Sequence, residues 1–128
     1  MRQKSGSPTR HLRVRHYQGH TVLEFRGEID IASAAEIVPH LDRETARPGA
    51  RIVLDLGGIE FFDCSGLRLL YRARSQVLDQ GGQVLLVCAH PLTLRMLRIT
   101  GLARLLPPRP TLDEALDVSP PAGPRTGR

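Results

Sequence analysis

The residues best suited to chemistry in this sequence are the neighbours Asp63, Cys64 and Ser65, which place a carboxylate, a thiol and a hydroxyl side by side. Residues 51–56 before them are apolar at four of six positions and include β-branched Ile and Val, which predicts a strand. From Leu67 onward apolar residues recur at helical spacing. A helix start carries unpaired N–H groups and partial positive charge, which suit an anion such as phosphate. We therefore expect the function of the chain at this turn.

Each residue of the turn has a structural role to weigh against a chemical one. Asp63 is a good helix N-cap and also a carboxylate that a partner could contact. Cys64 is either a small packing residue or a thiolate whose pKa the helix start lowers. Ser65 is a second candidate cap and the candidate phosphorylation site. Gly66 allows close backbone approach where the helix begins.

Strands alternate with helices along the chain after an opening hairpin. This order predicts an α/β fold, with a mixed, mostly parallel sheet and helices packed against it. In such sheets functional loops collect at the carboxyl ends of the strands, where the turn at Asp63 lies. The expected strands span residues 12–16, 21–26, 51–56, 83–89 and 102–106, and the expected helices span 30–45, 67–80, 91–100 and 111–116.

Glycine, proline and capping residues set several of these boundaries. Residues 27–30 are expected to end the second strand, and Gly57–Gly58 the central one. Asp30 or Ser33 would cap the helix that follows. Pro39 falls inside that helix and predicts a kink or a late start.

The charge of the chain is concentrated at its two ends. The formal net charge is +5, but residues 1–10 and 119–128 hold five of the 18 basic residues and no acid. The expected domain, residues 11–118, therefore has 13 basic and 13 acidic residues. The polar ends predict disordered tails, and a neutral domain with few aromatic residues does not favour nucleic-acid binding.

The cysteines and histidines form no pattern typical of a metal site or a disulfide framework. Two cysteines, Cys64 and Cys88, follow adjacent strands in the expected fold, so a disulfide between them is conceivable. The rarity of disulfides in cytoplasmic proteins argues against it. No apolar run is long enough to span a membrane, and the N-terminus has no apolar signal core. We expect a cytoplasmic protein with no cofactor, no metal, no membrane partner and no catalytic constellation.

Three stretches of the sequence resemble the STAS-domain anti-sigma factor antagonist (anti-anti-sigma factor) family of bacteria. The resemblance covers roughly residues 11–118 and predicts a single STAS domain. Its motifs are Gly27-Glu28-Ile29-Asp30, then Asp55-Leu56 through Asp63-Cys64-Ser65-Gly66-Leu67, and finally Gly81-Gly82 with Pro91 and Thr100-Gly101-Leu102.

The resemblance implies a regulatory function without catalysis. A member of the family binds an anti-sigma factor and so frees a sigma factor for transcription. The anti-sigma factor is typically a serine kinase of the histidine-kinase-like ATPase fold, which phosphorylates the serine after the signature Asp, and a serine phosphatase restores binding. Here that position is Cys64, so we predict at best a poor kinase substrate, with Ser65 as the remaining acceptor.

The expected partner-binding residues surround the turn. Glu28 and Asp30 should lie near it, although capping of the next helix explains them equally well. Arg68 and Arg72, four apart on the central helix, could bind acids of a partner or remain solvated. The full predicted set is Glu28, Asp30, Asp63, Cys64, Ser65, Gly66 and Arg68.

Two other functions use the same residues. A small-molecule- or nucleotide-binding STAS module would have an enclosed cavity at the strand ends, whereas an adaptor would have an open, shallow surface. A cysteine-based redox protein would need an exposed Cys64 with a lowered pKa.

Overall fold

The computed structural model describes residues 6–117, which form a six-stranded sheet and five helices. β1, β2 and β3 pair antiparallel, and β3, β4, β5 and β6 pair parallel. The expected mixed sheet with an N-terminal hairpin is confirmed. The strands are β1 (Gly6–Thr9), β2 (Leu12–Tyr17), β3 (His20–Ile29), β4 (Arg51–Phe62), β5 (Gln83–Val87) and β6 (Pro108–Arg109), and the helices are α1 (Ile31–Thr45), α2 (Cys64–Asp79), α3 (Pro91–Thr100), α4 (Leu102–Leu105) and α5 (Leu112–Asp117).

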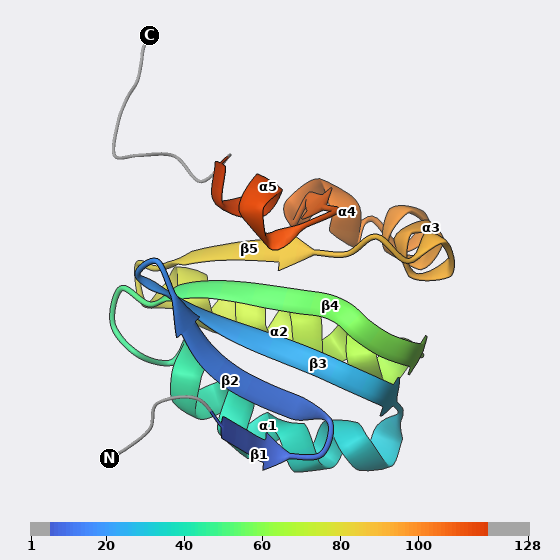
Figure 1. The fold of residues 1–128 in the computed structure, drawn as a ribbon, viewed down its shortest axis with the longest axis horizontal. Helices are drawn as coiled ribbons and strands as arrows, with labels where there is room; N and C mark the ends of the chain where they lie inside the picture. Colours follow the sequence, from blue (N-terminus) through green and yellow to red (C-terminus); the bar gives the residue numbers. More distant parts are fainter. Residues whose placement is uncertain (1–5, 118–128) are drawn as a thin grey trace, which may run out of the picture.

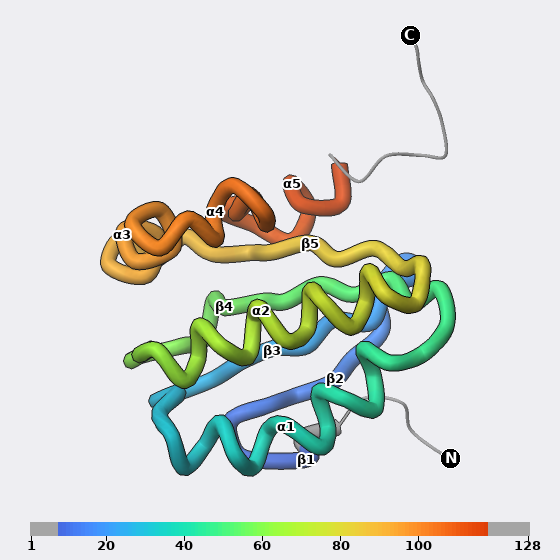
Figure 2. The backbone as a smooth tube through the Cα atoms, turned by 180° about the vertical axis from the view of Figure 1, so that it is seen from behind, coloured from blue at the N-terminus to red at the C-terminus, as the bar shows by residue number. Residues whose placement is uncertain are grey.

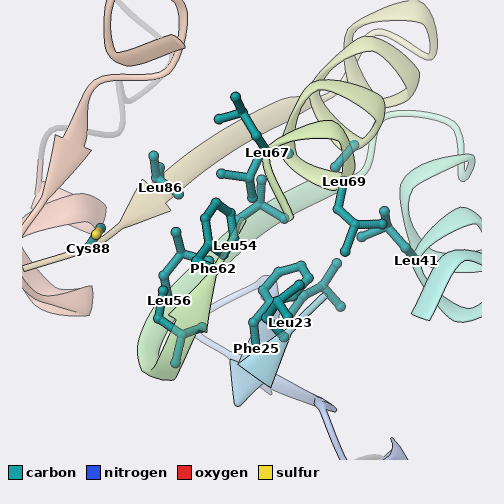
Figure 3. Packing of buried hydrophobic residues seen from close by; sticks show 14 of the residues in the cluster. Leu23, Phe25, Leu41, Leu54, Leu56, Phe62, Leu67, Leu69, Leu86 and Cys88 are labelled. Carbon is teal, nitrogen blue, oxygen red and sulfur yellow. The ribbon is translucent and has the colours of Figure 1, made fainter. Parts of the chain in front are cut away.

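Helices α1 and α2 cover one face of the sheet, as Figures 1 and 2 show from opposite sides. The main core lies between them and that face, and Figure 3 shows Leu54, Phe62 and Leu67 within it. The opposite face carries α5, whose Ala115 packs with Val22 and Val53. Because β3, β4 and β5 are parallel, the starts of α1, α2 and α3 gather at one end of the sheet, on the right in Figure 1.

The central strands are longer than the sequence predicts. β4 continues through Gly57 and Gly58 to Phe62, and β3 continues through Gly27 to Ile29. The reason is a change of register in the β3–β4 pair. Glu24 pairs with Asp55 and Arg26 pairs with Gly58, so β4 has one more residue than β3 in this interval. A Cβ on Gly58 would lie 3.3 Å from the carbonyl oxygen of Phe25, so Gly58 allows close pairing with β3 at an irregularity instead of ending the strand.

The leucines after Gly101 form a helix, not the expected strand. Leu102 and Leu106 are four residues apart and both buried, while Leu105 is exposed, which is helical spacing. The Leu106 N–H donates to the Leu102 carbonyl at 2.8 Å. The last strand is instead β6, which pairs with the end of β5.

Two other boundaries differ from expectation. Residues 6–9 form β1 and pair with β2, so the prediction of a disordered tail over residues 1–10 is wrong for this part. The expected tail at 119–128 lies outside the described residues. Helix α1 begins directly after Asp30 and includes Pro39, which excludes a late start.

Candidate functional site

Asp63 occupies the cap of α2. Its Oδ1 accepts a hydrogen bond of 2.7 Å from the Ser65 N–H, and its own N–H donates to the Ile29 carbonyl at 3.3 Å. The first bond satisfies one of the free N–H groups of the helix start. The second ties the start of α2 to the end of β3. The expected cap at Asp63 is confirmed, and helix α2 begins at Cys64, three residues before the expected position.

A second capped helix starts beside the first. Asp30 accepts from the Ser33 N–H at 3.0 Å, and Ser33 Oγ accepts from the Asp30 N–H at 2.9 Å, which forms a reciprocal capping box. Ser33 Oγ also donates to the Glu28 carbonyl at 2.8 Å. Hydrogen bonds from Ser33 hold the pKa of Asp30 below its usual value. Of the two expected caps, Asp30 and Ser33, Asp30 is therefore the N-cap of α1.

The structure brings the acidic residues predicted from the sequence to the same end of the sheet. Glu28 pairs with Phe61 across the β3–β4 ladder, and Asp30 and Asp63 cap the helices that follow these two strands. Glu28 is exposed and lies in β3, not in the expected loop. The edge therefore presents carboxylates beside two helix starts.

The next two residues of the turn differ in exposure. Cys64 is an exposed free thiol, whereas Ser65 is half-buried and faces a groove between α1 and α2. Cys88 is also a free thiol and lies in the core, where burial raises its pKa. The two cysteines are therefore not bridged.

Gly66 is buried and fills a packing role. A Cβ at this position would lie 2.5 Å from the Phe62 ring, closer than non-bonded carbon atoms approach. Gly66 is among the predicted partner-binding residues, but the contact with Phe62 is enough to explain why this position needs a glycine.

The groove beside Ser65 has an apolar floor and a basic rim. Its volume is about 390 Å³, and its apolar lining comes from Ile31, Ala34, Ala35, Val38 and Leu69. Arg68 is exposed on its rim. Arg72 is occupied within the protein, because Nε and Nη2 donate to the two carboxylate oxygens of Asp42, both at 2.7 Å. The Arg72 guanidinium also lowers the pKa of Asp42.

On the other side of the turn lies a recess that the sequence did not predict. Its volume is about 170 Å³, and it separates the end of β4 from α3. Phe61 and Leu92, which line it, are 52% and 72% exposed. Spacing in the sequence could not have revealed it, because Leu92 is itself at helical spacing from Met96 and Ile99, and only the burial of Thr93 and Leu97 shows which side of α3 packs.

Comparison with known proteins identifies the domain. The family model described as the STAS domain matches residues 11–115. The chain belongs to the STAS domain family. Within residues 6–117 of this STAS domain, no helix is long and apolar enough to cross a membrane. The same residues contain no group of three or more His, Cys, Asp or Glu side chains placed to hold a metal ion.

Its relatives carry a consistent name. The anti-sigma-F factor antagonist RsfB of Mycobacterium tuberculosis is 30% identical over 103 residues, which cover 80% of this chain and 84% of RsfB. The anti-sigma F factor antagonist of Paenibacillus polymyxa is 25% identical over 97 residues, 75% of this chain and 83% of that protein. A crystal structure of an anti-sigma factor antagonist from Mycobacterium paratuberculosis is 30% identical, with a TM-score of 0.68, and the match covers 88% of this chain and 96% of that one.

Proposed function

We propose that this STAS domain is an anti-sigma factor antagonist that binds an anti-sigma factor of the serine-kinase type, with the histidine-kinase-like ATPase fold, and so releases a sigma factor in the bacterial cytoplasm. The observation that carries the proposal is the capped turn at Asp63–Ser65, with exposed Cys64, beside the separately capped start of α1, in a chain whose relatives are named anti-sigma factor antagonists. The role is binding and regulation, without catalysis.

In this proposal the partner contacts the end of the sheet where α1 and α2 begin. Glu28, Asp30 and Asp63 supply negative charge, so basic residues of the partner would complement them. Arg68 would contact an acidic group at the rim of the groove. Because the caps fix Asp30 and Asp63 before binding, the partner meets a preorganised surface and little ordering is required.

The open shape of the site favours a protein partner over a small ligand. The depressions that flank the turn are open to solvent, and the larger one lies between two helices. A small-molecule site usually encloses most of its ligand's surface. The alternative function, a small-molecule- or nucleotide-binding STAS module, therefore has less support.

Regulation of this domain follows from the difference between Cys64 and Ser65. A kinase that expects an exposed hydroxyl directly after Asp63 meets the thiol of Cys64 instead. Ser65 is less accessible, since it faces the groove. A phosphate on Ser65 would add about −1.5 to −2 charges beside Asp63 and Asp30. The bulk of the phosphate would oppose docking of a partner that fits the bare turn, and its charge would repel the acidic group that Arg68 contacts in the same groove. A serine phosphatase would reverse the effect.

The function is tested with purified components. The anti-sigma factors encoded by the source genome are expressed one by one, each loaded with its sigma factor, and titrated with this domain. Release of sigma factor, followed by size-exclusion chromatography and by transcription from a sigma-dependent promoter, supports the proposal. If no anti-sigma factor binds or releases its sigma factor, the proposed function is wrong.

The regulatory part is tested by phosphate incorporation. Intact mass is measured for the wild type, Cys64→Ser and Ser65→Ala after incubation with the cognate kinase and ATP. We expect slow or absent modification of the wild type, faster modification of Cys64→Ser, and loss of any residual signal in Ser65→Ala. Rapid, stoichiometric modification of the wild type that Ser65→Ala abolishes would refute the poor-substrate prediction.

A further inference from the structure

The recess between β4 and α3 is part of the same end of the molecule as the turn. It is lined by Glu60, Phe61 and Phe62 of β4 and by Leu92, Thr93 and Met96 of α3, with His90 at the start of that helix. Asp63 directly follows this part of β4, so the turn lies between the recess on one side and the α1–α2 groove on the other. The two depressions thus flank the turn at the same end of the sheet.

Large apolar side chains stand exposed on both sides of the turn. Ile31 is 77% exposed at the groove, and Phe61 and Leu92 are also largely exposed at the recess. Water-exposed apolar residues that cluster around a depression typically mark an interaction site. Scattered single residues would carry no such meaning, but Phe61 and Leu92 line the same recess.

Phe62 connects the recess to the turn. Its ring forms a wall of the recess and also fills the space that a Cβ on Gly66 would need. It is buried in the main core, so its position is fixed. The recess and the first turn of α2 are therefore held in a constant relative position, as a two-part binding surface requires.

The rim of the recess is acidic on the β4 side. Glu60 is exposed there, and Glu28 lies on the neighbouring strand, whose pairing sets Glu28 opposite Phe61. An apolar group entering the recess would therefore be accompanied most favourably by a basic group.

We propose that the β4–α3 recess is a second anchor point for the same anti-sigma factor, and that it takes one large aliphatic or aromatic side chain of that protein, next to a Lys or Arg that pairs with Glu60. This inference rests on the proposed function and extends it. The partner's footprint spans the turn from the α1–α2 groove to α3, and the recess contributes to the choice among related anti-sigma factors.

The test compares exposed apolar residues of the recess with one that lies elsewhere on α3. Leu92→Ser and Phe61→Ser remove the recess lining, and Ile99→Ser is the matched control, because Ile99 is 74% exposed on α3 but does not line the recess. The probe is the anti-sigma factor that binds the wild type, and affinity is measured by isothermal titration calorimetry. We expect each recess variant to weaken binding about tenfold or more, and Ile99→Ser to change it less than about twofold.

A second measurement does not depend on truncating a side chain. The chain contains no tryptophan, so Phe61→Trp with 5-fluorotryptophan provides a single fluorine signal at the recess. Addition of the partner should shift this signal and protect it from a paramagnetic solvent probe. The same label introduced as Ile99→Trp should remain exposed to the solvent probe. Far-ultraviolet circular dichroism confirms that each variant is folded.

The outcomes separate the two proposals. If the wild type binds no anti-sigma factor, the proposed function fails and the second anchor fails with it. If the wild type binds and Ile31→Ser weakens binding, while Leu92→Ser and Phe61→Ser bind as the wild type does, only the second anchor is refuted. Equal loss in Leu92→Ser and Ile99→Ser would also refute it, since the effect would then belong to α3 as a whole.

Discussion

Replacing Gly66 by alanine tests whether this glycine serves packing or partner contact. The added Cβ would lie 2.5 Å from one carbon of the Phe62 ring, 2.6 Å from a second and 2.8 Å from a third. Phe62 is buried in the core, so relief of the contact requires a packed ring to move. Three contacts below 3 Å place this overpacking at the upper end of the usual cost of about 1–3 kcal/mol, roughly 2–3 kcal/mol, whereas alanine in a helix interior gains only about 1 kcal/mol over glycine. We therefore expect Gly66→Ala to lower the free energy of unfolding by roughly 1–2 kcal/mol.

The cause can be separated from a general effect of the substitution. Phe62→Leu makes room at the ring position, so the double variant Gly66→Ala/Phe62→Leu should be less destabilised than the two single effects add up to, by about 1 kcal/mol. Urea unfolding followed by circular dichroism gives all four values, and Ser75→Ala, at an exposed position of α2, is the control. A neutral or stabilising Gly66→Ala, or strictly additive effects, would refute the packing explanation.

Two further predictions concern stability. Burial, assisted by the charge of Arg51, lowers the pKa of His20 below 6.5, so the folded state disfavours the protonated ring. The stability contributed by the neutral His20 ring should be fully present above pH 6.5 and fall as pH decreases through that value toward the lowered pKa. His20→Gln should flatten this part of a plot of urea midpoint against pH. An unchanged slope in His20→Gln would contradict the prediction. Ser33→Ala removes the bond that Ser33 Oγ accepts from the Asp30 N–H and the bond that it donates to the Glu28 carbonyl, and should cost about 1–2 kcal/mol by the same unfolding assay. Ala32→Ser, exposed in the same first turn, should change stability by less than about 0.5 kcal/mol.

The parts of the fold that sequence could predict are those in which local signals agree. The hairpin of β2 and β3, the α2 cap at Asp63 and the start of α3 at Pro91 each follow from alternation, a capping side chain or a proline at the first turn. These signals act within a few residues. They can therefore be recognised without knowing which residues become neighbours in the folded domain.

The errors occurred where tertiary pairing overrides the local signal. Gly57–Gly58 has the composition of a strand end, but pairing with β3 carries the strand through both residues. Tyr71 and Leu78 fit a helical apolar pattern on α2 and are nevertheless exposed, while Leu69 is buried against the core. Which side of a helix meets the sheet depends on how the helix is placed, and a single sequence does not specify this.

The candidate site shows the same division. The residues of the turn were predicted because their types are unusual together, and Glu28 and Asp30 because of the motif before α1. The recess was missed because its two exposed apolar members, Phe61 and Leu92, are 31 residues apart in the sequence and become neighbours only through the order of β4 and β5 in the sheet. Apolar residues on a strand and on a helix look like core until burial is known.

The signature turn also divides into residues that the fold requires and residues that it leaves free. Asp63 is needed as a cap, Gly66 by the Phe62 ring, and Leu67 by the core, so their identities carry little information about a partner. Cys64 is exposed, and the hydrogen bond at Ser65 comes from its backbone, so neither side chain is fixed by a packing contact of this kind.

If this domain binds an anti-sigma factor as proposed, we expect the choice of partner to depend on side chains that the fold does not require. Side chains that stability does not determine are free to differ among STAS domains that bind different anti-sigma factors, because a change there costs little in folding. In this chain those positions are Cys64, Ser65 and the exposed apolar residues on either side, Ile31 and Leu92. In the proposed function, a thiol at the position where a phosphoacceptor is expected would change how the interface is regulated without a cost to the fold that presents it.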